Sequence, residues 1–571
     1  MNVHPLSRPH VIQSCLRLLA AVLLHTGEVP TTPVQEPLCL YYNGRILLND
    51  GRGSVAGALL ERDGKVLAVG TVEDLGRRPD AKNAARIDLQ GGVALPGLQD
   101  AHVDLDAMVE SQEWLDLSEC SSYAQVIERV SARAAQLPAG TWVLGQGWDQ
   151  NKWSGHQLPH HLLLSAQVPK HPVYLEHAAG EFALVNALAL EQAKLSGVLE
   201  PPPRVQGGRV LVDEQKRASG LLVQEARSLV RALFPALAPE RRQKNLLAVQ
   251  QALLAEGLTC VHDQGTSPEL LRLLRDLRAR GELQLRYVCY PDVSGDAQVG
   301  NWPKAPQPDV PLDLLSVPGV HLCLDGPVSA RSAALLEPYA DAPRERGTLL
   351  MEEERFSARL SQAAQSKLQP VIEAHGDRSA RLALDTLARL YAGYSSARLL
   401  RPRIEGVQVV APKDWPRFPE LGVLPCLQPS RWLRDLVWMG DALGPERFAG
   451  TQAWRMLAPD LKRLALGSGA TDPRSASPKH TFYAARTRPG SDLLDDMANW
   501  QSVDAGSALN AMTCGAAWGC FQEDRRGRLM PGYQCDMTVL SLDPLKADPK
   551  DVLKSRVKLV VVNGEVAWRP K

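Results

Sequence analysis

The stretch Leu95-Pro-Gly-Leu-Gln-Asp-Ala-His-Val-Asp-Leu-Asp106 decides how the fold of this chain is interpreted. The run from Gly91 to Leu95 predicts the start of a buried strand, and the following Pro-Gly pair marks a bend. Polar residues then occupy alternate positions, so they point the same way while the chain stays extended. His102 and Asp104, two residues apart on one strand face, could reach a single cation. The same spacing also occurs on solvated loops, so the motif alone is a weak metal signal.

Between residues 96 and 485, predicted strands alternate with predicted helices. A helix over Pro239–Glu256 leads into the strand Leu258–Asp263, and a helix from Ser267 to Gly281 leads into the strand Leu283–Tyr290. Further predicted strands are Val320–Leu324, Pro370–His375, Arg403–Val410, Gly422–Gln428 and Leu464–Ser468. This repetition indicates an α/β fold with a parallel sheet covered by helices. The number of units favours a (β/α)₈ TIM barrel over an open sheet.

The two ends of the chain have a different, antiparallel pattern. Leu38–Gly70 alternates around the turn Asp63-Gly64, and Val557–Trp568 alternates around Asn563-Gly564. Strands isolated at both termini need partners, so we expect one small β-sandwich built from both ends with the barrel inserted between them. The predicted division is an extension at 1–36, a sandwich at 37–95 and 486–571, and a barrel at 96–485 with an excursion at 107–235.

Polar side chains fall at the predicted carboxyl ends of the barrel strands, where such folds place their active sites. These residues are His102, Asp263, Asp325, His375, Glu405 and Ser468. Their recurrence at equivalent positions predicts a catalytic site at this end of the barrel.

Composition excludes several partners. Lys plus Arg and Asp plus Glu both number 64, so no global field favours nucleic acid or an acidic membrane. Ten scattered cysteines without a Cys-x-x-Cys pair favour reduced thiols and a cytoplasmic location. The apolar run Cys15–Leu24 is interrupted by Arg17, which favours a leading helix or a disordered extension over a signal peptide. We expect a small-molecule substrate, no nucleic-acid or membrane partner, and leave a homodimer open.

The segment from Pro96 to Asp104 resembles the Pro-Gly-Phe-Ile-Asp-Ala-His-x-His opening of the amidohydrolase superfamily. The resemblance is to its long, metal-dependent TIM-barrel hydrolases of C–N bonds, which include N-substituted formamide deformylase. It extends through Trp142–Asp149, Glu181–Leu190 and Ser219–Leu222 to Gly532–Asp536. It implies hydrolysis of a non-peptide, amide-type C–N bond by metal-activated water. It also implies a divalent metal, with zinc expected, at one ion per chain.

By this resemblance, four residues match metal-ligand positions of the family. His102 and Asp104 match the two histidines of the first strand, and His375 matches a later histidine. His321 takes the place of the family lysine, and an imidazole cannot form the carbamate that bridges two metals. The expected metal centre is therefore mononuclear.

Other family positions are changed, which leaves the general base open. Gly406 stands where the family has a histidine, and Gly469 stands where it has the aspartate that accepts the proton of water. The candidate catalytic residues are Asp472, Glu181 and Glu405. We assign substrate binding to Trp148, Asp325 and Arg331.

Two further interpretations of the same residues stay open. His102 and His375 could be core histidines paired with Asp104 or Asp377, with no metal bound. The chain would then be a catalytically impaired scaffold of the amidohydrolase fold that binds a small molecule or a protein. Non-hydrolytic barrel chemistry, such as isomerisation or decarboxylation, is the remaining alternative.

Overall fold

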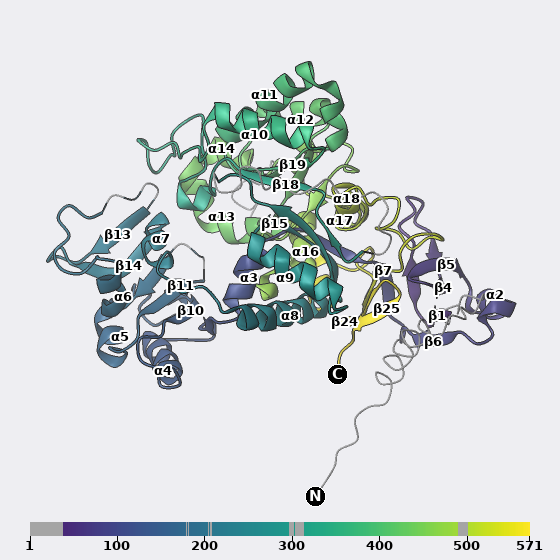
Figure 1. Ribbon diagram of the computed structural model, residues 1–571, viewed down its shortest axis with the longest axis horizontal. Helices are drawn as coiled ribbons and strands as arrows, with labels where there is room; N and C mark the ends of the chain where they lie inside the picture. The colour runs from purple at the N-terminus through teal and green to yellow at the C-terminus, as the bar shows by residue number, and fades with distance from the viewer. Residues whose placement is uncertain are drawn as a thin grey trace, which may run out of the picture.

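The computed structural model describes residues 38–178, 180, 182–203, 205, 208–295, 302, 313–488 and 501–571. The architecture is mixed α/β, with parallel strands and their helices at the centre (Figure 1). The predicted extension at residues 1–36 and the candidate base Glu181 lie outside the described residues. Within the described part, no helix has the length and apolar character needed to cross a membrane.

Strands from the two ends of the chain form two sheets that share a core. One sheet has the order β5-β4-β1-β6, and the other has the order β25-β24-β23-β7-β2-β3, so N-terminal and C-terminal strands pair directly in the second. The shared core contains Tyr41, Leu59, Val66, Met537 and Val561. The strands are β1 (Cys39–Tyr42), β4 (Ala58–Arg62), β5 (Lys65–Gly70), β6 (Ala85–Asp88), β2 (Arg45–Leu47), β3 (Val55–Ala56), β7 (Val93–Pro96), β23 (Met537–Leu540), β24 (Val557–Val562) and β25 (Glu565–Trp568).

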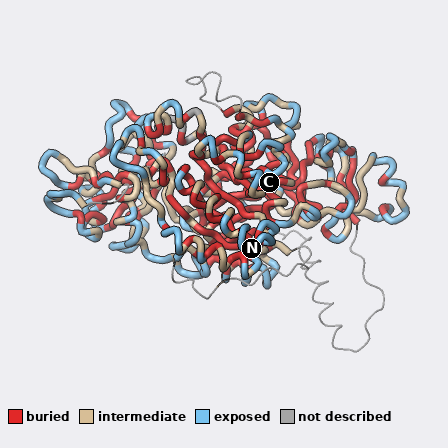
Figure 2. Tube along the Cα trace, turned by 90° about the horizontal axis from the view of Figure 1, so that it is seen from above, coloured by how far each residue is buried: buried red, intermediate tan, exposed pale blue. Residues whose placement is uncertain are grey.

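The central strands form two parallel sheets, of order β17-β16-β15-β8 and β18-β19-β20-β21-β22. Nearly every residue of these strands is buried, as expected for parallel strands covered on both faces (Figure 2). The first sheet contains β8 (Leu98–Val103), β15 (Leu258–Thr266), β16 (Arg286–Pro291) and β17 (Leu315–Ser316). The second contains β18 (Gly319–Cys323), β19 (Gln369–Ala374), β20 (Arg403–Gly406), β21 (Leu424–Leu427) and β22 (Ala465–Leu466).

The two central sheets meet at both edges through short parallel contacts. At one edge Val103 bridges Ala470, and the Gly469 N–H donates to the His102 carbonyl at 2.9 Å. At the other edge Asp292 bridges His321, and the Val293 N–H donates to the His321 carbonyl at 3.0 Å. These contacts bring the carboxyl ends of β8, β22, β16 and β18 to the same side of the molecule.

Amphipathic helices cover the outer faces of the central sheets. In α9 (Pro268–Ala279), the Ser267 hydroxyl accepts the Leu270 N–H as an N-cap, and Leu270, Leu274 and Leu277 are buried beneath the helix. The other long helices beside the strands are α8 (Pro239–Ala255), α10 (Glu353–Gln365) and α11 (Asp377–Gly393). Both helices predicted before and after residue 258 are thus confirmed, and each buries its apolar face.

Several predicted strands are shorter in the structure, and one of them ends at a turn of the backbone. The strand expected over Arg403–Val410 ends at Gly406 as β20. Gly406 has φ +81° and Val407 has φ 38°, so both residues are in the left-handed region and the chain turns there. The apolar run beyond Gly406 is buried, although it belongs to no strand.

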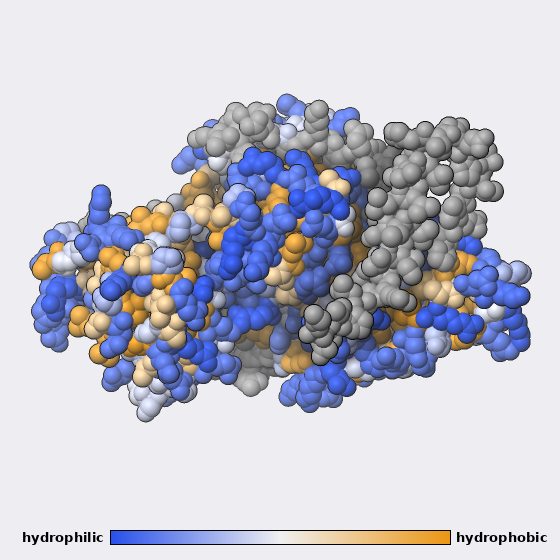
Figure 3. Space-filling view, turned by 60° about the horizontal axis from the view of Figure 1, so that its bottom comes forward, coloured by the Kyte–Doolittle hydropathy of each residue, from blue (hydrophilic) through white to orange (hydrophobic). Residues whose placement is uncertain are grey.

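The excursion after β8 carries a six-stranded sheet of its own, of order β13-β14-β12-β11-β10-β9, at the left of Figure 1. Its strands are β9 (Leu115–Asp116), β10 (Val143–Trp148), β11 (Val173–His177), β12 (Phe182–Val185), β13 (Gly208–Val212) and β14 (Ala218–Gln224). Apolar patches appear between polar ones on this part of the surface in Figure 3. Leu162 and Leu163 are among its exposed apolar residues. Among the described residues, the excursion presents one wall to the ends of the central strands through Trp114, Glu176 and Arg231.

Candidate active site

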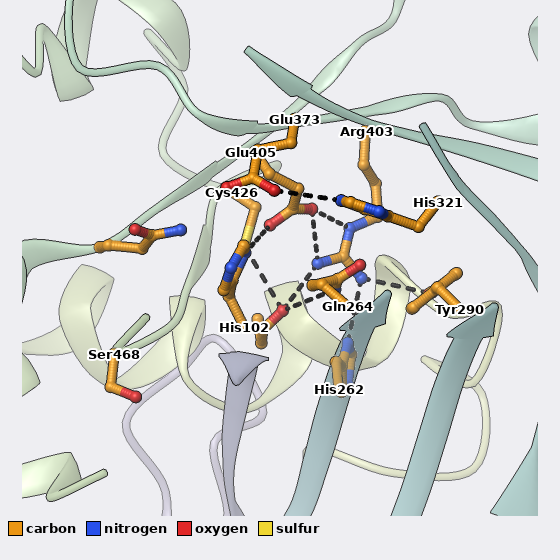
Figure 4. Close-up of polar contacts among 12 residues, drawn as sticks. His102, His262, Gln264, Tyr290, His321, Glu373, Arg403, Glu405, Cys426 and Ser468 are labelled. Carbon is orange, nitrogen blue, oxygen red and sulfur yellow. Dashed lines mark hydrogen bonds and ion pairs between the residues drawn. The ribbon is translucent and has the colours of Figure 1, made fainter. Parts of the chain in front are cut away.

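Polar side chains of the central strands face one another at the carboxyl ends (Figure 4). Several strands contribute two such residues separated by one, because alternate residues of a strand point to the same side. These pairs are Asp100 with His102 on β8, His262 with Gln264 on β15, Glu373 with His375 at the end of β19, and Arg403 with Glu405 on β20. The arrangement brings together residues that are more than three hundred positions apart in sequence.

His102 and Glu405 are in direct contact. The His102 Nδ1 atom lies 2.8 Å from Glu405 Oε2, and the other carboxylate oxygen of Glu405 accepts the Arg403 Nε–H at 2.8 Å. Burial alone would raise the pKa of Glu405, but the Arg403 guanidinium and the His102 imidazole outweigh it and lower that pKa. Glu405, a candidate base in the sequence, is therefore a fully buried carboxylate bound to two cationic or donor groups.

Arg403 is the centre of this first set of contacts. Its side chain is inaccessible to solvent, and it donates to the Ala101 carbonyl at 2.8 Å and to the Tyr290 hydroxyl at 3.2 Å. Its Nη1 atom also lies 3.0 Å from His262 Nδ1. Burial, reinforced by this guanidinium, lowers the pKa of His262 well below its ordinary value, so His262 stays neutral and accepts from Arg403.

A second set of contacts joins His321 and His375 through Glu373. The Glu373 carboxylate lies 3.3 Å from His321 Nε2 and 2.8 Å from His375 Nε2, one oxygen to each ring. The His321 Nδ1 atom faces Asp292 at 3.7 Å. Burial opposes the charged form of His321, but Asp292 and Glu373 together outweigh it and raise its pKa to about 10. Burial also opposes the charge of Glu373, but the two imidazoles bring its pKa well below the ordinary value.

Asp325, predicted to bind substrate, is bound to the backbone. Its carboxylate accepts the N–H groups of His375 at 2.7 Å, Gly376 at 2.9 Å and Ala334 at 2.8 Å, and the Ser379 hydroxyl at 2.6 Å. Its side chain is fully buried. These contacts fix the turn that carries His375, so Asp325 positions this candidate site residue through its backbone.

Asp104 lies at the edge of an open pocket of about 680 Å³. Its Oδ1 atom accepts the Ala107 N–H at 2.9 Å and so caps α3 (Leu105–Ser111). Burial raises the pKa of Asp104 to about 6, although the Ala107 N–H opposes the rise. Opposite walls of the pocket come from the excursion and from the loop after β22, and its lining includes Trp114, Glu176, Arg231, Gly469 and Asp472.

The remaining predicted site residues occupy different places. Asp472 lines the pocket but caps the turn Pro473–Ser475 through the N–H groups of Arg474 and Ser475. Trp148 is fully buried in the excursion, and its indole N–H donates to the Leu175 carbonyl at 2.8 Å. Arg331 pairs with Asp341, at 3.0 Å from its Nε, and lines a separate cavity of about 1470 Å³.

The arrangement of these side chains does not fit a single metal ion. Among the described residues, no three side chains of His, Cys, Asp or Glu are arranged to hold one. Gly406 and Gly469 are in the left-handed region, with φ of +81° and +64°. A Cβ at Gly406 would lie 2.6 Å from His375 Nδ1, and a Cβ at Gly469 would lie 2.7 Å from Gln428 Oε1. Neighbouring side chains thus fill the space where family ligands would begin.

Three residues of these contacts were absent from the predicted site: Glu373, Arg403 and His262. Each stands two positions from another polar residue of its strand, which is the spacing that drew attention to His102 and Asp104. Applying that alternation to every predicted strand would have found Glu373 and Arg403. The pairing of His102 with Glu405 rather than Asp104 could not be predicted in this way, because it depends on the register between strands.

Polar groups at the carboxyl ends of parallel strands, beside an open pocket, are the arrangement in which α/β enzymes bind their substrates. The Amidohydrolase family matches residues 85–567, and the chain belongs to this family. The Bacillus subtilis (strain 168) protein named "Putative amidohydrolase YtcJ" is 26% identical over 545 residues, covering 93% of this chain and 99% of that protein. The N-substituted formamide deformylase of Arthrobacter pascens is 26% identical over 247 residues, covering 42% of this chain and 45% of that enzyme.

A solved structure has the same fold over nearly the whole chain. An uncharacterized metal-dependent hydrolase from Pyrococcus horikoshii OT3 superimposes with a TM-score of 0.73 at 26% identity, covering 90% of this chain and 99% of its own. The predicted superfamily is therefore confirmed, and these relationships support a hydrolase. The metal dependence of that neighbour favours a divalent ion in the family, whereas the side chains described above are not arranged for one in this chain.

Proposed function

We propose that this protein hydrolyses an amide-type, non-peptide C–N bond of a small molecule bound in the pocket beside Asp104. The observation that carries the proposal is the position of this polar pocket at the carboxyl ends of β8 and β22, where α/β enzymes of this kind bind their substrates. Membership of the amidohydrolase family and the similarity to N-substituted formamide deformylase support the bond type.

Asp104 is the residue we assign to proton transfer. Amide hydrolysis requires a base to accept a proton from water and an acid to protonate the leaving amine. A carboxyl group with a pKa of about 6 is present in both protonation states near neutral pH, so it could serve each step in turn. Its Oδ1 atom holds the start of α3, which fixes the carboxyl relative to the pocket.

The excursion supplies the binding wall. The Arg231 guanidinium lies over the Trp114 ring at 5.8 Å and 3.7 Å from the Glu176 carboxylate, and Arg227 donates to Glu176 at 3.0 Å. An aromatic face beside paired charges suits a small molecule with both an apolar part and a polar amide. This wall would also limit the access of bulk water to the reacting bond.

We assign no step of this reaction to a metal. Zinc at one ion per chain was expected from the sequence, with His102, Asp104, His321 and His375 as ligands. Two of these histidines are bound to Glu373 and one to Glu405, and the described residues offer no convergent set of ligands.

A second function is favoured by the two glycines at Gly406 and Gly469. A family member without side chains at these positions lacks groups that the resemblance assigns to hydrolysis, and losing a general base alone removes about 10²–10⁴ in rate. The pocket would then bind a small molecule without converting it. This alternative makes a distinct prediction, because a ligand would stabilise the protein while no product forms.

We further propose that the two central sheets form one closed (β/α)₈ barrel, inserted into a sandwich of strands from both chain ends. The contacts Val103–Ala470 and Asp292–His321 at both sheet edges support a closed ring. The domain limits are those predicted from the sequence, 37–95 with 486–571 and 96–485. An experimental structure in which either edge contact is open, with water or side chains between the strands, would overturn closure.

The hydrolase proposal is tested with Asp104→Asn. Asparagine caps helices as well as aspartate, so α3 should persist while the titrating carboxyl is lost. Amine release from a panel of N-substituted formamides and acetamides should fall by about 10²–10⁴, with the melting temperature nearly unchanged. Asp504→Asn, at the exposed N-cap of α17 (Ala505–Ala511), is the matched control and should keep full activity. Ligand-induced stabilisation without any amine release would replace the hydrolase by the binding function.

A further inference from the structure

Glu373 uses both oxygens of its carboxylate on histidines of the same chain. One oxygen lies 3.3 Å from His321 Nε2 and the other lies 2.8 Å from His375 Nε2. His321 also faces Asp292, at 3.7 Å from its Nδ1 atom. The two carboxylates thus face both ring nitrogens through which His321 could bind a metal. Glu373 and Asp292 therefore both lie within ion-pair distance of His321.

His102 is likewise bound by a carboxylate of another central strand. Its Nδ1 atom is held by Glu405 at 2.8 Å, and Glu405 is in turn held by Arg403 at 2.8 Å. Arg403 and Glu405 are both inaccessible to solvent, so their charges must compensate each other within the protein. The positive charge beside the Glu405 carboxylate is therefore already supplied by a guanidinium.

Within the described part of the chain, both ring nitrogens of His321 are buried without a hydrogen-bond partner, but they face carboxylates at 3.7 and 3.3 Å. A further buried nitrogen that could suggest an open ligand position is His375 Nδ1. Among the described residues, it has no hydrogen-bond partner. It faces Gly406, and a Cβ at Gly406 would lie only 2.6 Å from it. A ligand side chain could not begin at position 406 without displacing the His375 ring, so the second ligand that an ion would need there is missing.

We infer that two ion-pair clusters of this chain, Asp292–His321–Glu373–His375 and His102–Glu405–Arg403, hold the carboxyl ends of the central strands together in place of a divalent cation. The first cluster joins β18, β19 and the residue after β16, and the second joins β8 and β20. The native structure of this protein is accordingly independent of a metal ion. The inference does not rest on C–N hydrolysis.

The test measures metal content and thermal stability of the full-length protein purified without added metal. We expect bound zinc, manganese, iron and nickel far below one ion per chain by mass spectrometry. We also expect a melting-temperature change below about 1 °C on adding a chelator or excess zinc, because a ligand of the native state alone would raise it. These measurements need no variant and no substrate, so their outcome is separate from that of the amine-release assay.

A matched pair of variants examines the cluster itself. Glu373→Gln should lower the melting temperature equally with and without chelator, because it removes the charge between two imidazoles. Glu353→Gln, which alters an exposed pair with Arg389, should change it by less than about 1 °C. About one ion per chain that is lost in Glu373→Gln, or a melting temperature that falls on chelation of the unaltered protein, would overturn the inference.

Discussion

The two ends of strand β16 lie beside buried charged groups with different surroundings. At its amino end, Arg286 binds Asp536 through two hydrogen bonds of 2.7 and 2.9 Å, and Asp536 also accepts the Asn563 N–H at 2.9 Å. At its carboxyl end, Tyr290 and Asp292 lie beside the Arg403 and His321 clusters. There, within the described part of the chain, buried atoms of His375, Gln264 and Gln428 lack hydrogen-bond partners.

Buried polar groups are used differently at the two ends of the strands. Arg286 and Asp536 connect the central strands to the sheets formed by the chain ends, and their hydrogen-bonding capacity is largely used. At the carboxyl ends, part of that capacity is unused, which costs stability and leaves groups available to a ligand. In parallel α/β folds the amino ends of the strands serve stability and the carboxyl ends serve function.

The largest expected effect comes from breaking the amino-end pair. Arg286→Met should lower the free energy of unfolding by about 3–5 kcal/mol, because Asp536 would be left as a buried, uncompensated charge. Arg278→Met is the matched control, since Arg278 forms a half-exposed pair with Asp313 and should cost less than about 1 kcal/mol. Urea unfolding followed by circular dichroism measures both. Equal losses would mean that the buried pair does not connect the two parts.

The next largest loss of stability is expected from a substitution of Gly406, at the carboxyl ends of the central strands. Gly406→Ala should cost about 1–2 kcal/mol for the left-handed backbone and about 1–3 kcal/mol for crowding His375. Gly422→Ala isolates the backbone contribution, because Gly422 has φ +68° and nothing within 4 Å of an added Cβ. The difference between the two variants in thermal unfolding reports the contact with His375. No difference would show that the ring moves aside freely and that position 406 has room for a side chain.

Substitutions of two glutamines allow the same comparison of the strand ends, with smaller expected losses of unfolding free energy. Gln369, at the start of β19, accepts from the Tyr290 hydroxyl at 2.9 Å and donates to the Arg401 carbonyl at 2.7 Å, so Gln369→Met should cost about 1–3 kcal/mol. Gln264, on β15, makes one weak contact of 3.4 Å, so Gln264→Met should cost less than about 1 kcal/mol. Chemical unfolding of both variants tests this order, and the reverse order would contradict the comparison.

The smallest effect is the acid dependence of the amino-end pair. Burial would raise the pKa of Asp536, but Arg286 and the Asn563 N–H outweigh it and hold that pKa below 3.8. The pair therefore contributes fully above the unfolded value of 3.8, and its contribution is lost as pH falls through the lower folded value. Urea unfolding between about pH 6 and pH 3 should show a shallower loss in Arg286→Met than in the unaltered protein. Parallel curves would show that Asp536 has no depressed pKa.

The pattern of residue types along the sequence predicted much of the fold. The runs around Leu258 and Leu283, each preceded by a helix and a glycine, predicted parallel strands correctly, because strands buried on both faces are rich in apolar residues. The turn Asp63-Gly64 was equally readable, since both residues have positive φ. The strand expected to continue past Gly406 was wrong beyond that point, because apolar residues continue after the backbone has turned.

The candidate site was only partly readable. The sequence by itself determined the family, the strands that carry polar residues, and the loss of side chains at Gly406 and Gly469. The tertiary structure alone decided that Glu405 holds His102, that Glu373 lies between His321 and His375, and that Asp104 borders the pocket. Spacing along one strand specifies which side a residue faces, whereas partners on neighbouring strands depend on register and twist, which only the packed sheets establish.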